Sequence, residues 1–278
     1  MKKIILDTDM ANQVDDQFAL VYLLKSLNNI ELKAITIAPF SKLKTIEEGT
    51  ELSYNTTLKI LELMDKNEYK DKVFKGATEY LKNDNKSNLA VNKIIEVCLK
   101  NDETTIIAIG ALTNLALAIK QEPKIIDRIK IIWLGGNDLS FNENMGTNFK
   151  DIDAVKVVFE SGVDLTVIPC KNVASNLITT IYELKHGMEE NVVNNFLIEQ
   201  LIKCNKDIQN IGTSKILWDL SAIAFIINEN WFTCKLISCP KILNDSSYEI
   251  IESNREITFV NTLNRDRIFE DFFRKVNL

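Results

Sequence analysis

Short apolar runs recur along the chain, and most are followed by a longer segment with the apolar spacing of a helix. The first run, Ile4–Leu6, precedes segment 18–24, whose apolar content and lack of Pro or Gly are typical of a buried helix. Further strands are expected at 30–38, 73–76, 104–110, 129–136, 164–169, near 236 and at 250–260. Helices are expected at 44–64, 89–99, 111–119, 151–161, 173–204 and from residue 265.

Strands that alternate with helices predict an α/β fold, a mostly parallel Rossmann-like sheet with helices on both faces. Segment 111–119 follows its strand directly, and Thr113 or Asn114 is the expected helix cap. The sequence contains neither a linker-like change of composition nor an internal repeat. We therefore expect a single domain over residues 1–278.

Composition narrows the classes of function. A hydrophobic fraction of 46% supplies a sizeable core, and a net charge of −6 gives no global attraction to nucleic acid or anionic membrane. Asp7 and Asp9 interrupt the N-terminal apolar run well before a signal-peptide length, and no apolar run reaches the roughly 18 residues of a membrane span. Five cysteines and one histidine indicate neither a disulfide framework nor a zinc site. We expect a cytoplasmic protein.

An acidic turn joins the first strand to the first helix, and it contains Asp7, Asp9, Asp15 and Asp16. In a parallel α/β sheet, ligands bind beyond the carboxyl ends of the strands, where this turn would lie. Asp7 and Asp9 are two residues apart and would point to the same side, whereas Asp15 and Asp16 would open the helix and could cap it. Four close carboxylates favour a divalent cation such as calcium or magnesium. The alternative is a capped helix with a solvated acidic turn.

Three further places would lie at the same edge of the sheet. The backbone carbonyl near Ile109 ends a strand and could complete a cage of oxygen ligands. The loop 135–148 contains Glu143 and Asn148 among several polar residues suited to sugar hydroxyls. Asp219 is an acid in an otherwise apolar stretch, and because a buried carboxylate is costly it should either cap a helix or bind a cation.

Taken in order, these motifs resemble the inosine-uridine-preferring nucleoside hydrolase family over nearly the full length. The residues that carry the resemblance are Asp7-Thr8-Asp9 with Asp15-Asp16, Gly110-Ala111-Leu112-Thr113-Asn114, Leu134-Gly135-Gly136, Asn148-Phe149 with Asp151, Trp218-Asp219, and Asn264-Arg265-Asp266-Arg267. The resemblance implies a calcium-dependent N-ribohydrolase that releases a free base and ribose in purine or pyrimidine salvage. We expect a homo-oligomer, a dimer or tetramer, whose partner is a small nucleoside or N-riboside.

The resemblance also implies roles for individual residues. Calcium would be bound by Asp9, Asp16, Asp219 and the Ile109 carbonyl. The ribose hydroxyls would be contacted by Asp15 and Asn148, with Asp219 near the 3′-hydroxyl, and Asp9 would be the general base toward a calcium-bound water. This fits the chemistry, because cleavage of an N-glycosidic bond gives the ribose oxocarbenium character that anionic surroundings stabilise.

The chain departs from the family pattern in several places. The acidic turn is two residues longer, and the family's ribose-binding Glu-Phe-Asn motif becomes Gly146-Thr147-Asn148, where Glu143 could replace the missing Glu. Trp218 stands where the family has a histidine, and it could stack on a base. His186, the single histidine, lies away from every motif and is interpreted as an exposed structural residue, so no histidine acid is assigned to the leaving group.

Two other functions stay open at this point. Residues 4–9 also resemble the opening motif of haloacid-dehalogenase-like phosphatases, in which Asp7 would attack phosphate and Asp9 would shuttle a proton with magnesium. The absence of a later Gly-Asp-x-x-x-Asp motif argues against that alternative. The second alternative is a nucleoside-binding or ribose-binding relative that keeps the metal cage but does not hydrolyse, which the missing Glu and His suggest.

Overall fold

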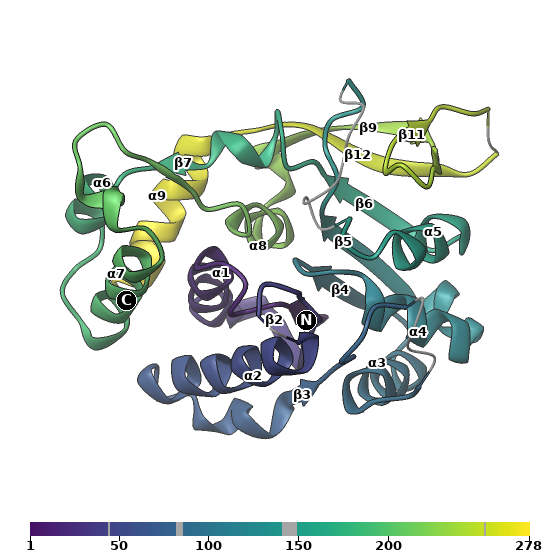
Figure 1. Ribbon diagram of the computed structural model, residues 1–278, viewed down its shortest axis with the longest axis horizontal. Coiled ribbons are helices and arrows are strands. Elements are labelled where there is room, and N and C mark those ends of the chain that lie inside the picture. Colours follow the sequence, from purple (N-terminus) through teal and green to yellow (C-terminus); the bar gives the residue numbers. More distant parts are fainter. Residues whose placement is uncertain (44, 82–85, 141–148, 253) are drawn as a thin grey trace.

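The computed structural model describes all residues except 44, 82–85, 141–148 and 253. Its centre is an eight-stranded sheet in the order β3-β2-β1-β4-β5-β6-β12-β9 (Figure 1). Neighbouring strands are parallel except β12 and β9, which are antiparallel. The strands are β1 (Lys2–Thr8), β2 (Ile30–Ile37), β3 (Val73–Lys75), β4 (Thr104–Ala108), β5 (Ile129–Leu134), β6 (Asp164–Ile168), β9 (Phe232–Ser238) and β12 (Glu256–Leu263). This confirms the expected mostly parallel α/β sheet.

Helices cover both faces of this sheet (Figure 1). The α-helices are α1 (Asp15–Leu24), α2 (Ile46–Leu63), α3 (Leu89–Lys100), α4 (Thr113–Gln121), α5 (Ile152–Glu160), α6 (Ile181–Gly187), α7 (Val192–Cys204), α8 (Leu220–Ile227) and α9 (Arg265–Val276). Short 3₁₀ helices connect them: η1 (Leu27–Asn29), η2 (Asn67–Lys72), η3 (Pro123–Arg128), η4 (Ala174–Asn176), η5 (Lys206–Gln209) and η6 (Glu229–Trp231).

Two hydrophobic cores lie on opposite sides of the sheet, and β1 contributes to both. Ile4 and Leu6 pack into the core formed with α1, α8 and α9, whereas Ile5 packs into the core formed with α3, α4 and α5. All three side chains are buried because a parallel sheet is covered on both faces. The continuous apolar run in the sequence reflects this double burial.

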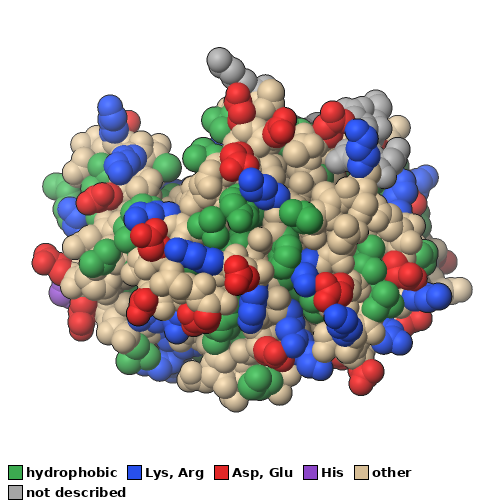
Figure 2. Space-filling view, turned by 90° about the horizontal axis from the view of Figure 1, so that it is seen from below, with side chains coloured by type: hydrophobic (Ala, Val, Ile, Leu, Met, Phe, Trp, Pro, Cys, Tyr) green, Lys and Arg blue, Asp and Glu red, His purple; other side chains and the backbone are tan. Residues whose placement is uncertain are grey.

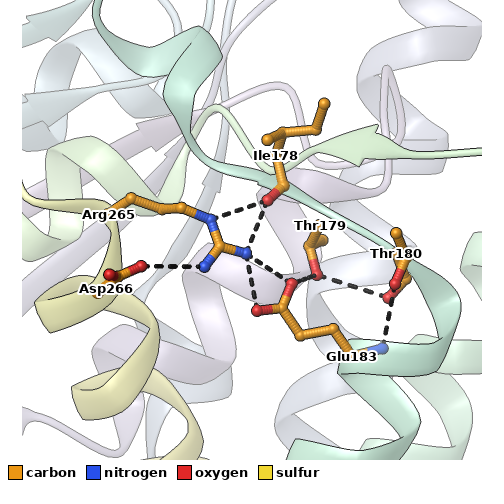
Figure 3. Close-up of polar contacts among 6 residues, drawn as sticks. All are labelled: Ile178, Thr179, Thr180, Glu183, Arg265 and Asp266. Atoms are coloured by element: carbon orange, nitrogen blue, oxygen red, sulfur yellow. Dashed lines mark hydrogen bonds and ion pairs between the residues drawn. The ribbon is translucent and has the colours of Figure 1, made fainter.

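Two short ribbons complete the fold, β10 (Lys241–Ile242) with β11 (Tyr248–Glu249) and β7 (Ile178–Thr179) with β8 (Lys215–Ile216). The β7–β8 ribbon leads directly to Trp218 and Asp219. Arg265, at the start of α9, donates hydrogen bonds to the Ile178 carbonyl and to Glu183 of α6 (Figure 3). The C-terminal helix therefore holds the ribbon in place.

Three expectations about local structure were wrong. Neither Thr113 nor Asn114 caps α4, because its cap is Leu112 and both side chains bind tertiary partners: Thr113 bonds Asp151, and Asn114 bonds Asp7 and the Ile37 carbonyl. Asp15 and Asp16 do not cap α1, whose cap position is Val14. Region 173–204 is helical only in part, since it also contains β7.

The strand order reverses between β1 and β4, which lie side by side at the middle of the sheet. The connections that leave their carboxyl ends diverge to opposite faces, and this divergence opens a crevice in which α/β proteins bind ligands. None of the helices in the described part of the chain is both long and apolar enough to cross a membrane.

Candidate active site

A small cavity of about 110 Å³ lies at this crevice. Asp9 follows β1, Asp15 and Asp16 begin α1, Ile109 follows β4, and Asp219 immediately precedes α8. The complete lining is Asp9, Asn12, Gln13, Asp15, Asp16, Ile109, Leu134, Cys170, Trp218 and Asp219. The structure therefore brings the distant Asp219 to the acidic turn.

Asp15, Asp16 and Asp219 form the tightest group in the cavity. One carboxylate oxygen from each lies within 4.8 Å of the other two. Each of these residues, and Asp9 beside them, is at most 4% exposed. The four acids are thus largely shielded from bulk solvent, which argues against the interpretation as a solvated acidic turn.

Burial and mutual repulsion dominate the electrostatics of the cavity. Burial raises the pKa of Asp219 well above its ordinary value, and the charges of Asp15 and Asp16 raise it further. Burial, followed by the charges of Asp9 and Asp15, likewise raises the pKa of Asp16 well above its ordinary value. Burial raises the pKa of Asp9 to about 6, against the opposing effect of Lys150. The negative charges are therefore poorly compensated by the protein alone.

Hydrogen bonds fix the orientation of the acids. Thr8 Oγ1 donates to Asp16 Oδ1 at 2.6 Å, and Asn12 Nδ2 donates to Asp9 Oδ2 at 2.7 Å. Asp15 Oδ1 is buried without a hydrogen bond, although Lys215 Nζ lies 3.9 Å away. Asp219 occupies the N-cap position of α8, as the capping alternative expected, but its side chain accepts no capping hydrogen bond there.

These residues fit a divalent oxygen-binding cation. Three buried carboxylates converge, one oxygen has no hydrogen bond, and the backbone next to β4 lines the same cavity. Hard cations such as calcium take several carboxylate and carbonyl oxygens, and they would relieve the repulsion that raises these pKa values. Asp15, Asp16 and Asp219 lie close enough together to hold such an ion, and Asp9 and Ile109 line the same cavity.

Asp7 lies elsewhere. It is fully buried beneath the turn, where its Oδ1 accepts hydrogen bonds from Thr36 Oγ1 at 2.5 Å and Asn114 Nδ2 at 3.0 Å. It does not belong to the cavity lining. A phosphatase nucleophile must reach its substrate, and this side chain cannot, so the geometry argues against the phosphatase alternative.

The other residues singled out in the sequence fall into three groups. Trp218 is half-buried and lines the cavity beside Asp219. Glu143 and Asn148 lie outside the described residues, so their contribution stays a prediction. His186 is exposed on α6, as expected.

Sequence reasoning missed four residues of the lining: Asn12, Gln13, Leu134 and Cys170. Asn12 and Gln13 belong to the longer acidic turn and could have been found from it. Leu134 ends β5, and Cys170 follows Pro169 just after β6. Because ligands bind beyond the carboxyl ends of parallel strands, the positions of Leu134 and Cys170 could also have been predicted from the expected strands.

The fold and the cavity define an α/β protein with a buried carboxylate site at the switch point of its sheet. Residues 4–269 match the family model described as inosine-uridine preferring nucleoside hydrolase, and the chain belongs to this family. This confirms the resemblance seen in the sequence.

Curated relatives match over parts of their length. The pyrimidine-specific ribonucleoside hydrolase RihB of Escherichia coli O157:H7 is 28% identical over 187 residues, which are 60% of this chain and 59% of the relative. Uridine nucleosidase 1 of Arabidopsis thaliana is 45% identical over 71 residues, which are 24% of this chain and 21% of the relative. The matched segments thus span less than two thirds of these relatives.

Solved structures match along nearly the whole chain. The plant nucleoside hydrolase PpNRh1 has a TM-score of 0.83 at 19% identity and is covered over 99% of both chains. A purine-preferring ribonucleoside hydrolase from Gardnerella vaginalis has a TM-score of 0.78 at 22% identity, over 99% of this chain and 98% of that one. At such identities, the likeness establishes the fold.

Proposed function

We propose that this chain hydrolyses the N-glycosidic bond of a ribonucleoside or related N-riboside, with calcium as its cofactor. The observation that carries the proposal is the meeting of Asp15, Asp16 and Asp219 in one cavity with Asp9. Membership of the nucleoside hydrolase family supports the same reaction. The products would be a free base and ribose.

Asp9 is the proposed general base. Its carboxylate lines the cavity at the end of β1, where it could take a proton from a water bound there. The hydrogen bond from Asn12 holds one of its oxygens and so orients the carboxylate. Calcium, when bound by Asp9, Asp16, Asp219 and the Ile109 carbonyl, would lower the pKa of water and orient the ribose diol.

The remaining residues would bind the substrate. Asp15 and Asp219 line the cavity and would accept hydrogen bonds from ribose hydroxyls, and their charges would stabilise the oxocarbenium character that develops on the sugar. Trp218 would stack on the base. Asn148 and Glu143, outside the described residues, are proposed to bind further ribose hydroxyls.

We also propose the cellular setting that this reaction suggests. The enzyme would act in the cytoplasm on small nucleosides, as a homodimer or homotetramer, and supply bases for salvage. Acidic and basic side chains are interspersed on the face shown in Figure 2. That face has no uniform basic surface of the kind that binds nucleic acid.

The test is release of free base from a panel of nucleosides in the presence of calcium. Asp9→Asn should lower kcat by about a thousandfold, because removal of a general base costs about 10²–10⁴. Asp245→Asn, at an exposed aspartate outside the cavity, is the matched control and should leave kcat unchanged. Saturable nucleoside binding without any base release would instead identify a binding protein.

A further inference from the structure

A second cavity adjoins the acidic one. It measures about 420 Å³, and it shares Asn12 and Gln13 with the first cavity. Its lining is Asn12, Gln13, Val14, Lys42, Leu201, Cys204, Asn205 and Lys215, which includes two lysines and no carboxylate. A ligand in the acidic cavity would therefore have a basic compartment beside it.

The long acidic turn holds both lysines in place. Lys42 Nζ donates a hydrogen bond to the Asn12 carbonyl at 2.6 Å, and Lys215 Nζ donates to Gln13 Oε1 at 2.7 Å. Lys215 also lies 3.9 Å from Asp15 Oδ1, so it bridges the two compartments. Asn12 and Gln13 of this turn thus lie between the acidic and the basic cavity.

A third lysine adds to the positive charge. Lys150 interacts electrostatically with both Asp9 and Lys42. Burial lowers the pKa of Lys42, and the charges of Lys150 and Lys215 lower it further. Among the residues that the structure describes, no carboxylate lies within 4.0 Å of Lys42 or Lys150.

A neutral nucleoside would bring no negative charge to the lysines of the second cavity. A bound divalent cation would compensate part of the charge of Asp9 and Asp15, the acids that act on Lys42, and Lys42 and Lys215 would then repel each other more strongly. An anionic substituent on the substrate would relieve that repulsion. Ammonium groups that already donate to carbonyl oxygens of the turn retain further N–H donors for such an anion.

We propose that the substrate is an N-riboside that carries a negative charge, and that Lys42 and Lys215 of the second cavity bind this charge beside the acidic cavity. The charge would be a phosphate on the ribose 5′-oxygen or a carboxylate on the base. This inference rests on the proposed hydrolase function and names its substrate class.

Three substrates with the same pyrimidine ring separate the possibilities. Uridine is neutral, uridine 5′-monophosphate is charged on the sugar, and orotidine is charged on the base. Release of free base with calcium should have a kcat/KM at least about tenfold higher for one of the charged substrates than for uridine, because the two lysines of the second cavity attract its anionic group. The preferred charged substrate identifies the position of the anion.

Variants of Lys42 test the assignment. Lys42→Met should lower kcat/KM for the preferred charged substrate about fivefold more than for uridine, and Lys42→Arg should restore most of the difference. Lys100→Met is the matched control, at an exposed lysine of α3, and should change neither value. Raising the salt concentration should reduce the preference for the charged substrate.

The outcomes also separate this inference from the function beneath it. Efficient cleavage of uridine with no preference for either charged substrate would overturn the inference and leave the hydrolase intact. If no substrate is cleaved, the hydrolase proposal fails, and calorimetric measurement of substrate binding tests the inference separately. The inference then requires that uridine 5′-monophosphate or orotidine binds more tightly than uridine and that Lys42→Met weakens this binding. Equal binding of all three compounds would overturn the inference.

Discussion

Arg265 and Glu183 form an ion pair, in which Arg265 Nη2 lies 2.7 and 2.6 Å from the two carboxylate oxygens of Glu183 (Figure 3). The same guanidinium donates to the Ile178 carbonyl from Nε at 3.1 Å and from Nη2 at 2.9 Å. Ile178 pairs with Ile216 in the β7–β8 ribbon, which leads to Trp218 and Asp219. Arg265 is therefore a positioning residue for the cavity.

Arg265→Ala should lower kcat/KM for base release about tenfold or more, because displacement of Asp219 by even a small distance misaligns the site. It should also weaken calcium binding, a property that a purely global loss of stability would leave intact at low temperature. Arg265→Lys should recover only part of both, since one ammonium cannot replace the Nε and Nη2 donors that join Glu183 to the Ile178 carbonyl. Steady-state kinetics measures kcat/KM, and calorimetry measures the calcium affinity.

Arg267→Ala is the matched control, because Arg267 lies on the same helix in an exposed pair with Glu270. Exposed pairs of this kind contribute about 0–1 kcal/mol, so activity and calcium affinity should stay within about twofold of wild type. Equal losses in Arg265→Ala and Arg267→Ala would contradict the positioning role.

Asp271 should make the fold more stable at neutral than at acidic pH. Burial raises the pKa of its carboxyl, but hydrogen bonds from Tyr22 and Lys275 outweigh this, and the net pKa lies below the ordinary value. A pKa lowered in the folded state contributes stability above the unfolded-state pKa, and this contribution is lost as the pH falls. Asp271→Asn should therefore cost about 1–3 kcal/mol at pH 7 and less near pH 3.

Urea unfolding of both proteins at the two pH values measures this difference. An equal cost of Asp271→Asn at both pH values would show that the carboxylate charge contributes nothing.

Asp7 should have the opposite pH dependence. Burial raises its pKa to about 7, and the hydrogen bonds from Thr36 and Asn114 only partly oppose this. Between about pH 4 and 7 the unfolded chain loses this proton while the folded chain keeps it, so the free energy of unfolding decreases as the pH rises. Asp7→Asn removes the titrating carboxyl group, so the free energy of unfolding should decrease less steeply with pH. This holds even if the substitution also changes stability by an amount that does not depend on pH.

The comparison is made without divalent cations, by following the unfolding free energy of wild type and Asp7→Asn from pH 4 to 7. Parallel curves for the two proteins would rule out a raised pKa at Asp7.

The sequence predicted the sheet well because doubly covered strands such as β1 have continuous apolar runs, which stand out beside amphipathic helices. It predicted the caps poorly, because Thr113 and Asn114 bond tertiary partners whose position depends on the whole fold. The two-residue strand β7 is too short to leave a pattern within a helical region.

The candidate site was predictable only in part. The acidic turn is local and visible in the sequence, but the approach of Asp219 to Asp15 depends on the order of the strands and on the β7–β8 ribbon. The resemblance to the nucleoside hydrolase family predicted that Asp219 would lie beside the acidic turn. The lysines of the second cavity carry no local motif, so only the assembled structure could place them.

The most direct test of the account is calorimetric titration of the metal-free protein with calcium, for wild type and for Asp219→Asn. We predict one calcium ion per chain for wild type and an affinity lowered at least about a hundredfold by the substitution, because a buried charged ligand is lost. Absence of calcium binding by wild type, or unchanged binding by Asp219→Asn, would contradict a cation shared between this distant aspartate and the N-terminal acids.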